Sequence, residues 1–211
     1  LTAHLFFSDM TWIYWLGWTL FRSLYRGIFK LKVTGWEHLV REGPVLVVSN
    51  HESFIDPPLI GTLYQDDMYY LARKSLMTTP ALKWIYKAWN SIPVDQDRPD
   101  MTGVKAIVKL LRSGNRVLIF PEGERTLDGN FGVAQPGTGL IVAKSNAVIQ
   151  PIRIRGAREA LPRGSGRIRF ARVSLNIGPP IRFTEEELAA AKGKEGYQKI
   201  ADRLMEAVAA L

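Results

Sequence analysis

The sequence contains no cysteine among its 211 residues. This absence excludes disulfide bridges, thiolate-bound metal sites and a cysteine nucleophile. Histidine is also scarce, because the chain has only His4, His38 and His51. A zinc site built from His51, Asp56 and Glu122 would need a second histidine, and neither His4 nor His38 lies near these residues in the sequence. We therefore expect no bound metal.

Acidic residues are in deficit, with 20 against 28 basic residues and a formal net charge of +8. Such a surplus favours an anionic partner: a phosphate-bearing substrate, an acidic membrane surface or nucleic acid. Many of the cations gather in one stretch, which contains Arg153, Arg155, Arg158, Arg163, Arg167, Arg169 and Arg172. No nucleic-acid-binding motif accompanies them, so we expect no nucleic-acid partner. A phosphate-rich donor, lipid headgroups and a merely solvated rim remain open as interpretations.

Long hydrophobic runs are missing as well. Residues 10–21 carry no charge and include Trp12, Trp15 and Trp18, but a transmembrane helix needs about 20 apolar residues. Beyond them, Arg22 and Arg26 begin a basic stripe at every fourth position. Tryptophan beside a basic stripe is typical of a helix that lies in a membrane interface. We predict that residues 1–30 form such an interfacial amphipathic, aromatic helix; a helix packed on the domain, or a span completed by residues upstream, are the alternatives.

Residues 31–211 alternate short apolar runs with segments of helical periodicity. Strands are expected at 32–35, 45–49, 68–72, 92–94, 117–120, 148–154 and 168–177, and helices at 57–63, 79–89, 100–111, 137–146 and from Thr184 onward. Thr79 is the expected cap of one helix, and Thr184 with Glu187 forms a capping box. This alternation predicts an α/β domain with a mixed, largely parallel sheet flanked by helices.

Chemistry-bearing residues follow two of these strands. The hexapeptide His51-Glu52-Ser53-Phe54-Ile55-Asp56 follows residues 45–49, and a histidine near an aspartate at a turn can act as a general base with its orienting carboxylate. Ser53 invites a serine-hydrolase interpretation, but the sequence lacks the Gly-x-Ser-x-Gly elbow. The segment Phe120-Pro121-Glu122-Gly123-Glu124-Arg125-Thr126 follows residues 117–119. Ligands collect at the carboxyl ends of parallel strands, so both segments are expected to share one crevice.

These two motifs, in this order, resemble those of the glycerolipid acyltransferase family, above all its 1-acyl-sn-glycerol-3-phosphate acyltransferases. The first family motif is Asn-His-x4-Asp, matched by Asn50, His51 and Asp56. The third is Phe-Pro-Glu-Gly-x-Arg-Ser/Thr, matched at every fixed position by residues 120–126. A weaker match is the apolar strand around Pro151. The resemblance covers residues 33–180 and implies an acyltransferase α/β domain over residues 31–211.

The resemblance also implies roles for individual residues. His51 and Asp56 would be catalytic. Glu122, Gly123, Arg125 and Thr126 would bind the acceptor, with the arginine fork suited to its phosphate.

The second family motif departs from its usual form. Family members place an arginine directly after a short strand and an aspartate, whereas here two further residues separate Asp95 from Arg98. We expect Arg98 to point into the site and to take the place of the family arginine despite this shift. Lys74 matches a family lysine that follows the preceding strand and is a second candidate for binding phosphate.

The expected reaction is transfer of a fatty acyl chain from acyl-CoA or acyl carrier protein to the free hydroxyl of 1-acyl-sn-glycerol-3-phosphate, giving phosphatidic acid. His51 would take the hydroxyl proton, without a covalent acyl-enzyme or a cofactor. Another lysophospholipid or lyso-aminolipid could be the acceptor instead, and a non-catalytic lipid-binding adaptor on the same fold is an alternative of a different class. The partners would be the lysophospholipid, the acyl thioester and the membrane, and the expected location is the cytoplasmic face of the inner membrane.

Overall fold

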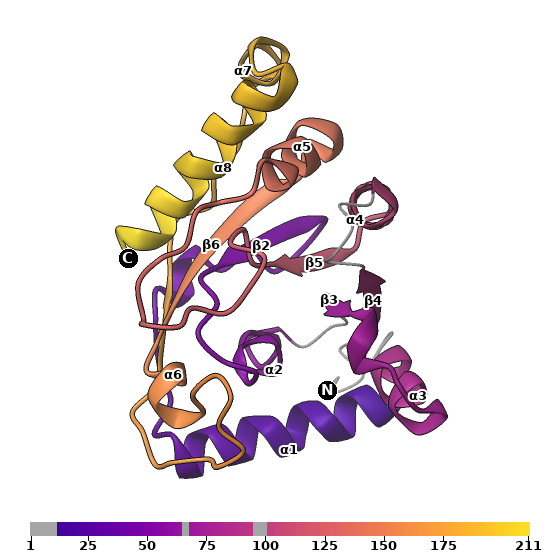
Figure 1. The fold of residues 1–211 in the computed structure, drawn as a ribbon. Coiled ribbons are helices and arrows are strands. Elements are labelled where there is room, and N and C mark those ends of the chain that lie inside the picture. Colours follow the sequence, from indigo (N-terminus) through magenta and orange to yellow (C-terminus); the bar gives the residue numbers. More distant parts are fainter. Residues whose placement is uncertain (1–11, 65–67, 95–100) are drawn as a thin grey trace, which may run out of the picture.

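The computed structural model describes residues 12–64, 68–94 and 101–211, and in these ranges seven strands form one sheet (Figure 1). The sheet order is β1-β7-β6-β2-β5-β3-β4. The strands are β1 (Lys32–Thr34), β2 (Val45–Ser49), β3 (Met68–Arg73), β4 (Ser91–Val94), β5 (Arg116–Ile119), β6 (Val148–Arg155) and β7 (Ser174–Ile177). Five of the six pairings are parallel, and only β6 with β7 is antiparallel. The predicted mixed, largely parallel sheet is therefore confirmed.

Helices cover both faces of the sheet. They are α1 (Trp12–Ile28), α2 (Asp56–Gly61), α3 (Pro80–Ala88), α4 (Met101–Arg112), α5 (Pro136–Ser145), α6 (Ala157–Ala160), α7 (Glu185–Ala190) and α8 (Gly193–Ala209), with short 3-10 turns at Trp36–His38 and Lys74–Leu76. The central strand β2 is buried along its whole length. Val45 and Val47 pack toward α1 and α2, whereas Leu46 and Val48 pack toward α4, α5 and α8. This alternation explains why the strand reads as an unbroken apolar run.

Two predicted helix caps are present. The Thr79 hydroxyl accepts a hydrogen bond from the Leu82 N–H at 3.2 Å. Thr184 and Glu187 exchange both bonds of a capping box. The helix that Thr184 begins is not the last one, however: α7 ends at Ala190, and Gly193, with φ of +88°, starts the separate helix α8.

The long strand predicted at 168–177 is wrong in extent, because only residues 174–177 belong to β7. The last register pair joins Arg155 to Ser174. β6 ends at Arg155, and the next residue, Gly156, has a φ of +85° that turns the chain into α6. Residues 168–172 therefore extend past the end of β6 and form part of an irregular loop.

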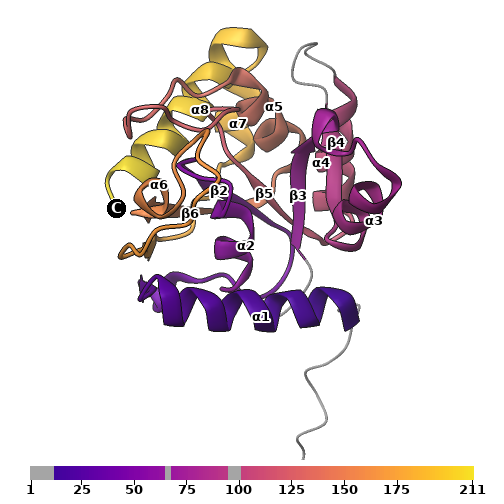
Figure 2. The same cartoon turned by 60° about the horizontal axis from the view of Figure 1, so that its bottom comes forward.

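Helix α1 lies along one side of the molecule, and α2 sits between it and the sheet (Figure 2). Tyr25 and Phe29 are buried in the core on this side, and Phe21 meets the ring of Trp89 edge-on. The opposite side of α1 exposes Trp15, Leu16 and Leu20 to solvent. Within the described ranges no helix is long and apolar enough to cross a membrane. One face of α1 thus belongs to the domain, while its other face presents uncovered apolar side chains.

Candidate active site

The site lies where β2 and β5 end. These strands are parallel neighbours, so the segments that follow them leave the sheet at the same edge. The His51 N–H donates to Glu122 Oε1 at 2.9 Å, and the Thr126 N–H donates to the His51 carbonyl at 2.8 Å. The two segments that sequence reasoning expected in one crevice are therefore joined directly. Pro151 lies within β6, beside Val48 of β2, and not beyond a strand end.

His51 and Asp56 form a hydrogen-bonded pair. The distance from His51 Nδ1 to Asp56 Oδ2 is 2.8 Å. The two residues can meet because residues 51–55 turn before Asp56 begins α2. The imidazole stacks on Phe120, with ring centroids 3.9 Å apart and planes 8° from parallel. When Nδ1–H donates to a carboxylate, the Nε2 lone pair is left free to accept a proton.

Asp56 is held as an acceptor from several directions. Its Oδ2 also accepts the backbone N–H groups of Glu52 at 2.6 Å and Ser53 at 2.7 Å, and its side chain is 0% exposed. The His51 side chain, in contrast, keeps 18% exposure. Asp56 thus cannot contact a substrate directly, whereas His51 can. Ser53 donates its hydroxyl to the Leu161 carbonyl at 2.7 Å, which is the bond of a structural turn residue and not of a nucleophile paired with His51.

Asn50, the asparagine of the first motif, fixes the site to β6. Its Oδ1 accepts the Ile154 N–H at 2.8 Å, and its Nδ2 donates to the Ile154 carbonyl at 2.9 Å. The side chain therefore replaces a strand partner at the point where β2 ends. This anchoring role was not predicted from the sequence, although the residue belongs to the motif.

Glu122 acts within the protein as a bridge. Its Oε1 accepts the His51 N–H at 2.9 Å, and its Oε2 accepts the Gly132 N–H at 2.6 Å. Burial raises the pKa of Glu122, while these two hydrogen bonds oppose that shift. The carboxylate ties the backbone of His51 to that of Gly132, and this contact positions His51 whatever else the side chain binds.

Glu52 is a buried acid that sequence reasoning missed. Its Oε2 accepts the N–H groups of Ala157 at 3.0 Å and Arg158 at 3.2 Å, and so connects the hexapeptide to the start of α6. Burial raises the pKa of Glu52 to about 7 in spite of these bonds. Nothing in a single sequence distinguishes such a residue from an ordinary surface glutamate.

Three arginines gather at one side of the site. The guanidinium of Arg125 lies 5.4 Å above the ring of Phe54. Burial, together with the charges of Arg163 and Arg73, lowers the pKa of Arg125. Arg163 also donates to the Arg125 carbonyl at 2.7 Å and pairs with Glu124 at 3.1 Å. Neighbouring guanidinium groups that repel one another are suited to a dianionic phosphate.

The remaining predicted site residues have separate outcomes. Lys74 begins an exposed 3-10 turn, while its neighbour Arg73 is the residue whose charge acts on Arg125. Gly123 has a φ of +76°, which the tight turn after β5 requires. The Thr126 hydroxyl accepts the Gly129 N–H at 2.9 Å and so shapes the following loop. Arg98 lies outside the described residues.

A small pocket opens beside the imidazole. It is lined by Asn50, His51, Thr126, Asn130 and Arg153, among others. Within the described ranges no cluster of three or more histidine and acidic side chains is placed to hold a metal ion. What the residues present offer is a proton acceptor at Nε2, polar groups and nearby cations. That arrangement can deprotonate a hydroxyl group beside a bound anion.

The sequence profile of the acyltransferase family matches residues 30–155, more than half of the chain. The chain belongs to the acyltransferase family. The match contains His51, Asp56, Glu122 and Arg125 and ends in β6. The resemblance inferred from the two motifs is thereby confirmed.

Several curated relatives are similar to this acyltransferase. One is a chloroplastic 1-acyl-sn-glycerol-3-phosphate acyltransferase of Arabidopsis thaliana, 27% identical over 83% of this chain and 49% of its own. Another is a 1-acyl-sn-glycerol-3-phosphate acyltransferase of Bacillus subtilis, 24% identical over 82% of this chain and 84% of its own. The chain spans about half the length of the plant relatives and most of the Bacillus protein.

A solved structure has the same fold. The crystal structure of the 1-acyl-sn-glycerophosphate acyltransferase PlsC from Thermotoga maritima superposes with a TM-score of 0.69 at 23% identity, covering 92% of this chain and 77% of that one. At this identity the likeness supports the α/β fold alone and does not identify the substrate.

Proposed function

We propose that this acyltransferase moves a fatty acyl chain from an acyl thioester to the free hydroxyl of 1-acyl-sn-glycerol-3-phosphate and releases phosphatidic acid. The observation that carries the proposal is the 2.8 Å contact between His51 Nδ1 and Asp56 Oδ2 at the edge of the arginine cluster. The names of the relatives favour the same acceptor.

The reaction would proceed by direct attack. As the acceptor hydroxyl approaches the thioester carbonyl carbon, its proton passes to His51 Nε2 and a new C–O bond forms. The tetrahedral intermediate then collapses, the C–S bond breaks, and the leaving thiolate takes the proton from the imidazolium. Asp56 stabilises the positive imidazolium through Nδ1, and a positioned base of this kind contributes about 10²–10⁴-fold to the rate. Both substrates are bound before the first step, so no acyl-enzyme is needed.

The acceptor phosphate would bind among the guanidinium groups of Arg125, Arg73 and Arg163. The planar fork of Arg125 can donate two parallel hydrogen bonds to phosphate oxygens. Its partial burial strengthens these bonds, because the surroundings are less polar than water. The phosphate would in turn relieve the repulsion between the three cations.

The outer side of α1 would hold the enzyme against the membrane that contains its acceptor. Trp15, Leu16 and Leu20 are exposed there, and Arg26 lies among the exposed residues of the same helix. Removing residues 1–30 would not test this contact cleanly, because Tyr25 and Phe29 belong to the core. Replacing Leu16 and Leu20 by serine removes exposed apolar side chains only and should reduce binding to lipid vesicles.

The test of the function is direct. The purified full chain is incubated with acyl-CoA or acyl carrier protein and a panel of lysophospholipids and lyso-aminolipids, and the products are separated by thin-layer chromatography. Phosphatidic acid formation that disappears in His51→Ala supports the proposal. Turnover of another acceptor alone would reassign the substrate, and normal turnover by His51→Ala would overturn the role of the base. Vesicle binding without transfer from either donor would indicate an adaptor instead.

A further inference from the structure

Residues 164–172, named here the basic loop, have a composition that the active site does not explain. The loop contains Arg167, Arg169 and Arg172 and no acidic residue. It also carries Phe170, which is 88% exposed, and Ile168, which is 56% exposed. Phe170 has the largest exposed fraction among the exposed large hydrophobic side chains of the described residues.

Backbone hydrogen bonds hold the loop near its middle and just beyond its C-terminal end, so this exposure is a fixed property of the fold. Near its middle the Arg169 N–H donates to the Ala160 carbonyl at 2.8 Å. Just beyond it Val173 is buried, and the Val173 N–H donates to the Phe29 carbonyl at 3.0 Å. These anchors fix the base of the loop, while Ile168 and Phe170 stay out of the core.

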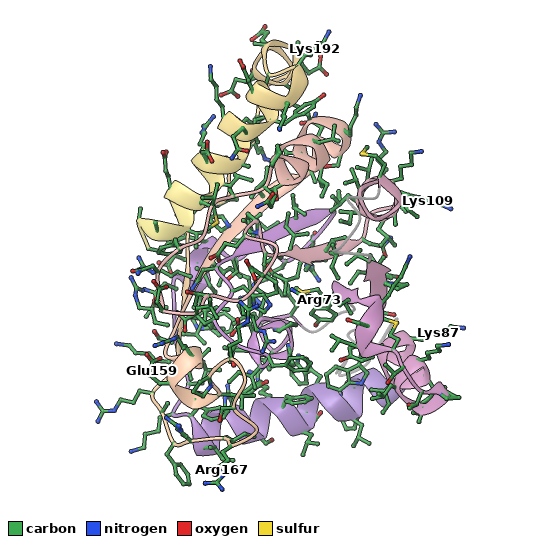
Figure 3. All side chains as sticks on the ribbon, in the orientation of Figure 1. Arg73, Lys87, Lys109, Glu159, Arg167 and Lys192 are labelled. Carbon is green, nitrogen blue, oxygen red and sulfur yellow. The ribbon has the colours of Figure 1, made fainter. Side chains whose placement is uncertain are left out.

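The anchor at Phe29 also determines where the loop lies. Phe29 directly follows the last residue of α1, and the loop lies beside the C-terminal end of that helix (Figures 1 and 2). Arg167 points away from the domain on the side of the molecule where α1 runs (Figure 3). The basic loop therefore extends the exposed apolar side of α1 at its basic end, where Arg26 and Lys30 are exposed.

We propose that the basic loop is a second membrane-docking element, in which Phe170 and Ile168 enter the lipid interface and Arg167 and Arg169 bind anionic headgroups. The occupant is an anionic bilayer surface, because cations interleaved with exposed apolar side chains complement phosphate groups above an apolar layer. Docking through both α1 and the basic loop would fix the orientation of the enzyme on the bilayer. Docking through α1 alone would leave the enzyme free to rotate about the helix axis. The proposal rests on the proposed membrane-bound acceptor, but vesicle binding tests it separately.

The experiment measures binding of the full chain by co-sedimentation with vesicles of phosphatidylcholine that contain about a third phosphatidylglycerol. Binding is measured at low and at high salt, because salt screens the attraction between exposed charges. We expect Ile168→Ser with Phe170→Ser to weaken binding about tenfold, since burying one large apolar side chain is worth at least that factor. Arg167→Gln with Arg169→Gln should weaken binding to anionic vesicles about tenfold, and this loss should disappear at high salt. The arginine variant should bind neutral vesicles as the unchanged protein does.

The matched control for charge is Lys192→Gln with Lys194→Gln. Lys192 lies at the opposite end of the molecule from Arg167 (Figure 3), and both lysines are exposed. Met101→Ser, an exposed apolar residue at the start of α4, is the control for hydrophobicity. The controls should bind vesicles as the unchanged protein does. Thermal unfolding of every variant should be unchanged, because the substituted side chains are exposed.

Three results of the vesicle assay would overturn the proposal. They are loop variants that bind within twofold of the unchanged protein, controls that lose as much binding as the loop variants, and an unchanged protein that does not bind vesicles. A loop variant that binds vesicles normally but loses transfer from acyl carrier protein alone would also overturn it, in favour of a surface for that acidic protein. Failure of the proposed function would give a different result: the unchanged protein would not transfer an acyl chain even to a dispersed short-chain lysophospholipid. The loop variants should keep that soluble activity.

Discussion

Replacing Asp56 by asparagine tests the proposed catalytic role of the His51–Asp56 pair most sharply, because it removes one charge and almost no volume. Asp56 Oδ2 accepts three hydrogen bonds, from His51 Nδ1 and from the N–H groups of Glu52 and Ser53. An asparagine oxygen in the same place can accept all three, but as a neutral acceptor it stabilises an imidazolium much less well. We expect kcat to fall ~10²–10⁴-fold, which corresponds to a loss of about 3–5 kcal/mol of transition-state stabilisation.

The effect on folding should be smaller. The second oxygen, Oδ1, is buried without a hydrogen-bond partner in the described residues, so the asparagine amide would take its place without an acceptor. Burying an unpaired donor costs about 1–3 kcal/mol, which leaves a domain of ordinary stability folded. The KM for the acceptor should change little, because Asp56 is 0% exposed and cannot contact a substrate.

The assay follows release of free thiol from the acyl thioester at saturating acceptor, with the unfolding free energy measured by denaturant in parallel. Asp202→Asn is the matched control: it is the same change at an exposed position of α8, where the carboxylate accepts a hydrogen bond from Gln198 at 2.8 Å. A folded Asp56→Asn that keeps more than about a tenth of the kcat would refute the role of the pair, because general-base catalysis is worth at least ~10²-fold.

Three further results are expected. Arg125→Lys keeps the charge but loses the planar fork, so the acceptor KM should rise about tenfold in steady-state kinetics while kcat changes little. Burial raises the pKa of Glu52 to about 7 from its usual 4.5, so its contribution to stability is complete below pH 4.5 and is lost as the pH rises through 7. Denaturant titrations at pH 5 and pH 8 should therefore show a pH-dependent loss of at most about 3 kcal/mol that Glu52→Gln removes; an identical pH dependence in both proteins would contradict this. Gly123→Ala should lower the unfolding free energy by about 1–2 kcal/mol, because φ of +76° is strained for alanine, and an unchanged melting curve would argue against that turn.

Predictions that depended on local pattern were largely confirmed. Residues 45–48 are uniformly apolar because β2 is covered on both faces, so the type and position of this strand could be predicted. Thr79 and Thr184 cap their helices through side chains only three residues away from their partners. The strand predicted at 168–177 was too long, because β6, its antiparallel partner, ends before Gly156 and only residues 174–177 pair with it. Pairing partners far apart in the chain are not encoded in local periodicity.

The sequence alone was enough to predict the residue types proposed for the chemistry: a histidine and an aspartate after one buried strand, and a glutamate and an arginine after another. Only the tertiary structure decided how they act together. The parallel pairing of β2 with β5 brings Glu122 to the His51 N–H, and it makes the carboxylate a bridge between backbone segments. Arg73 and Arg163 join Arg125 through elements that lie far apart in the chain. The tertiary structure also decided which apolar side chains of α1 are buried and which are exposed. Burial depends on what packs against a helix and not on the sequence of the helix alone.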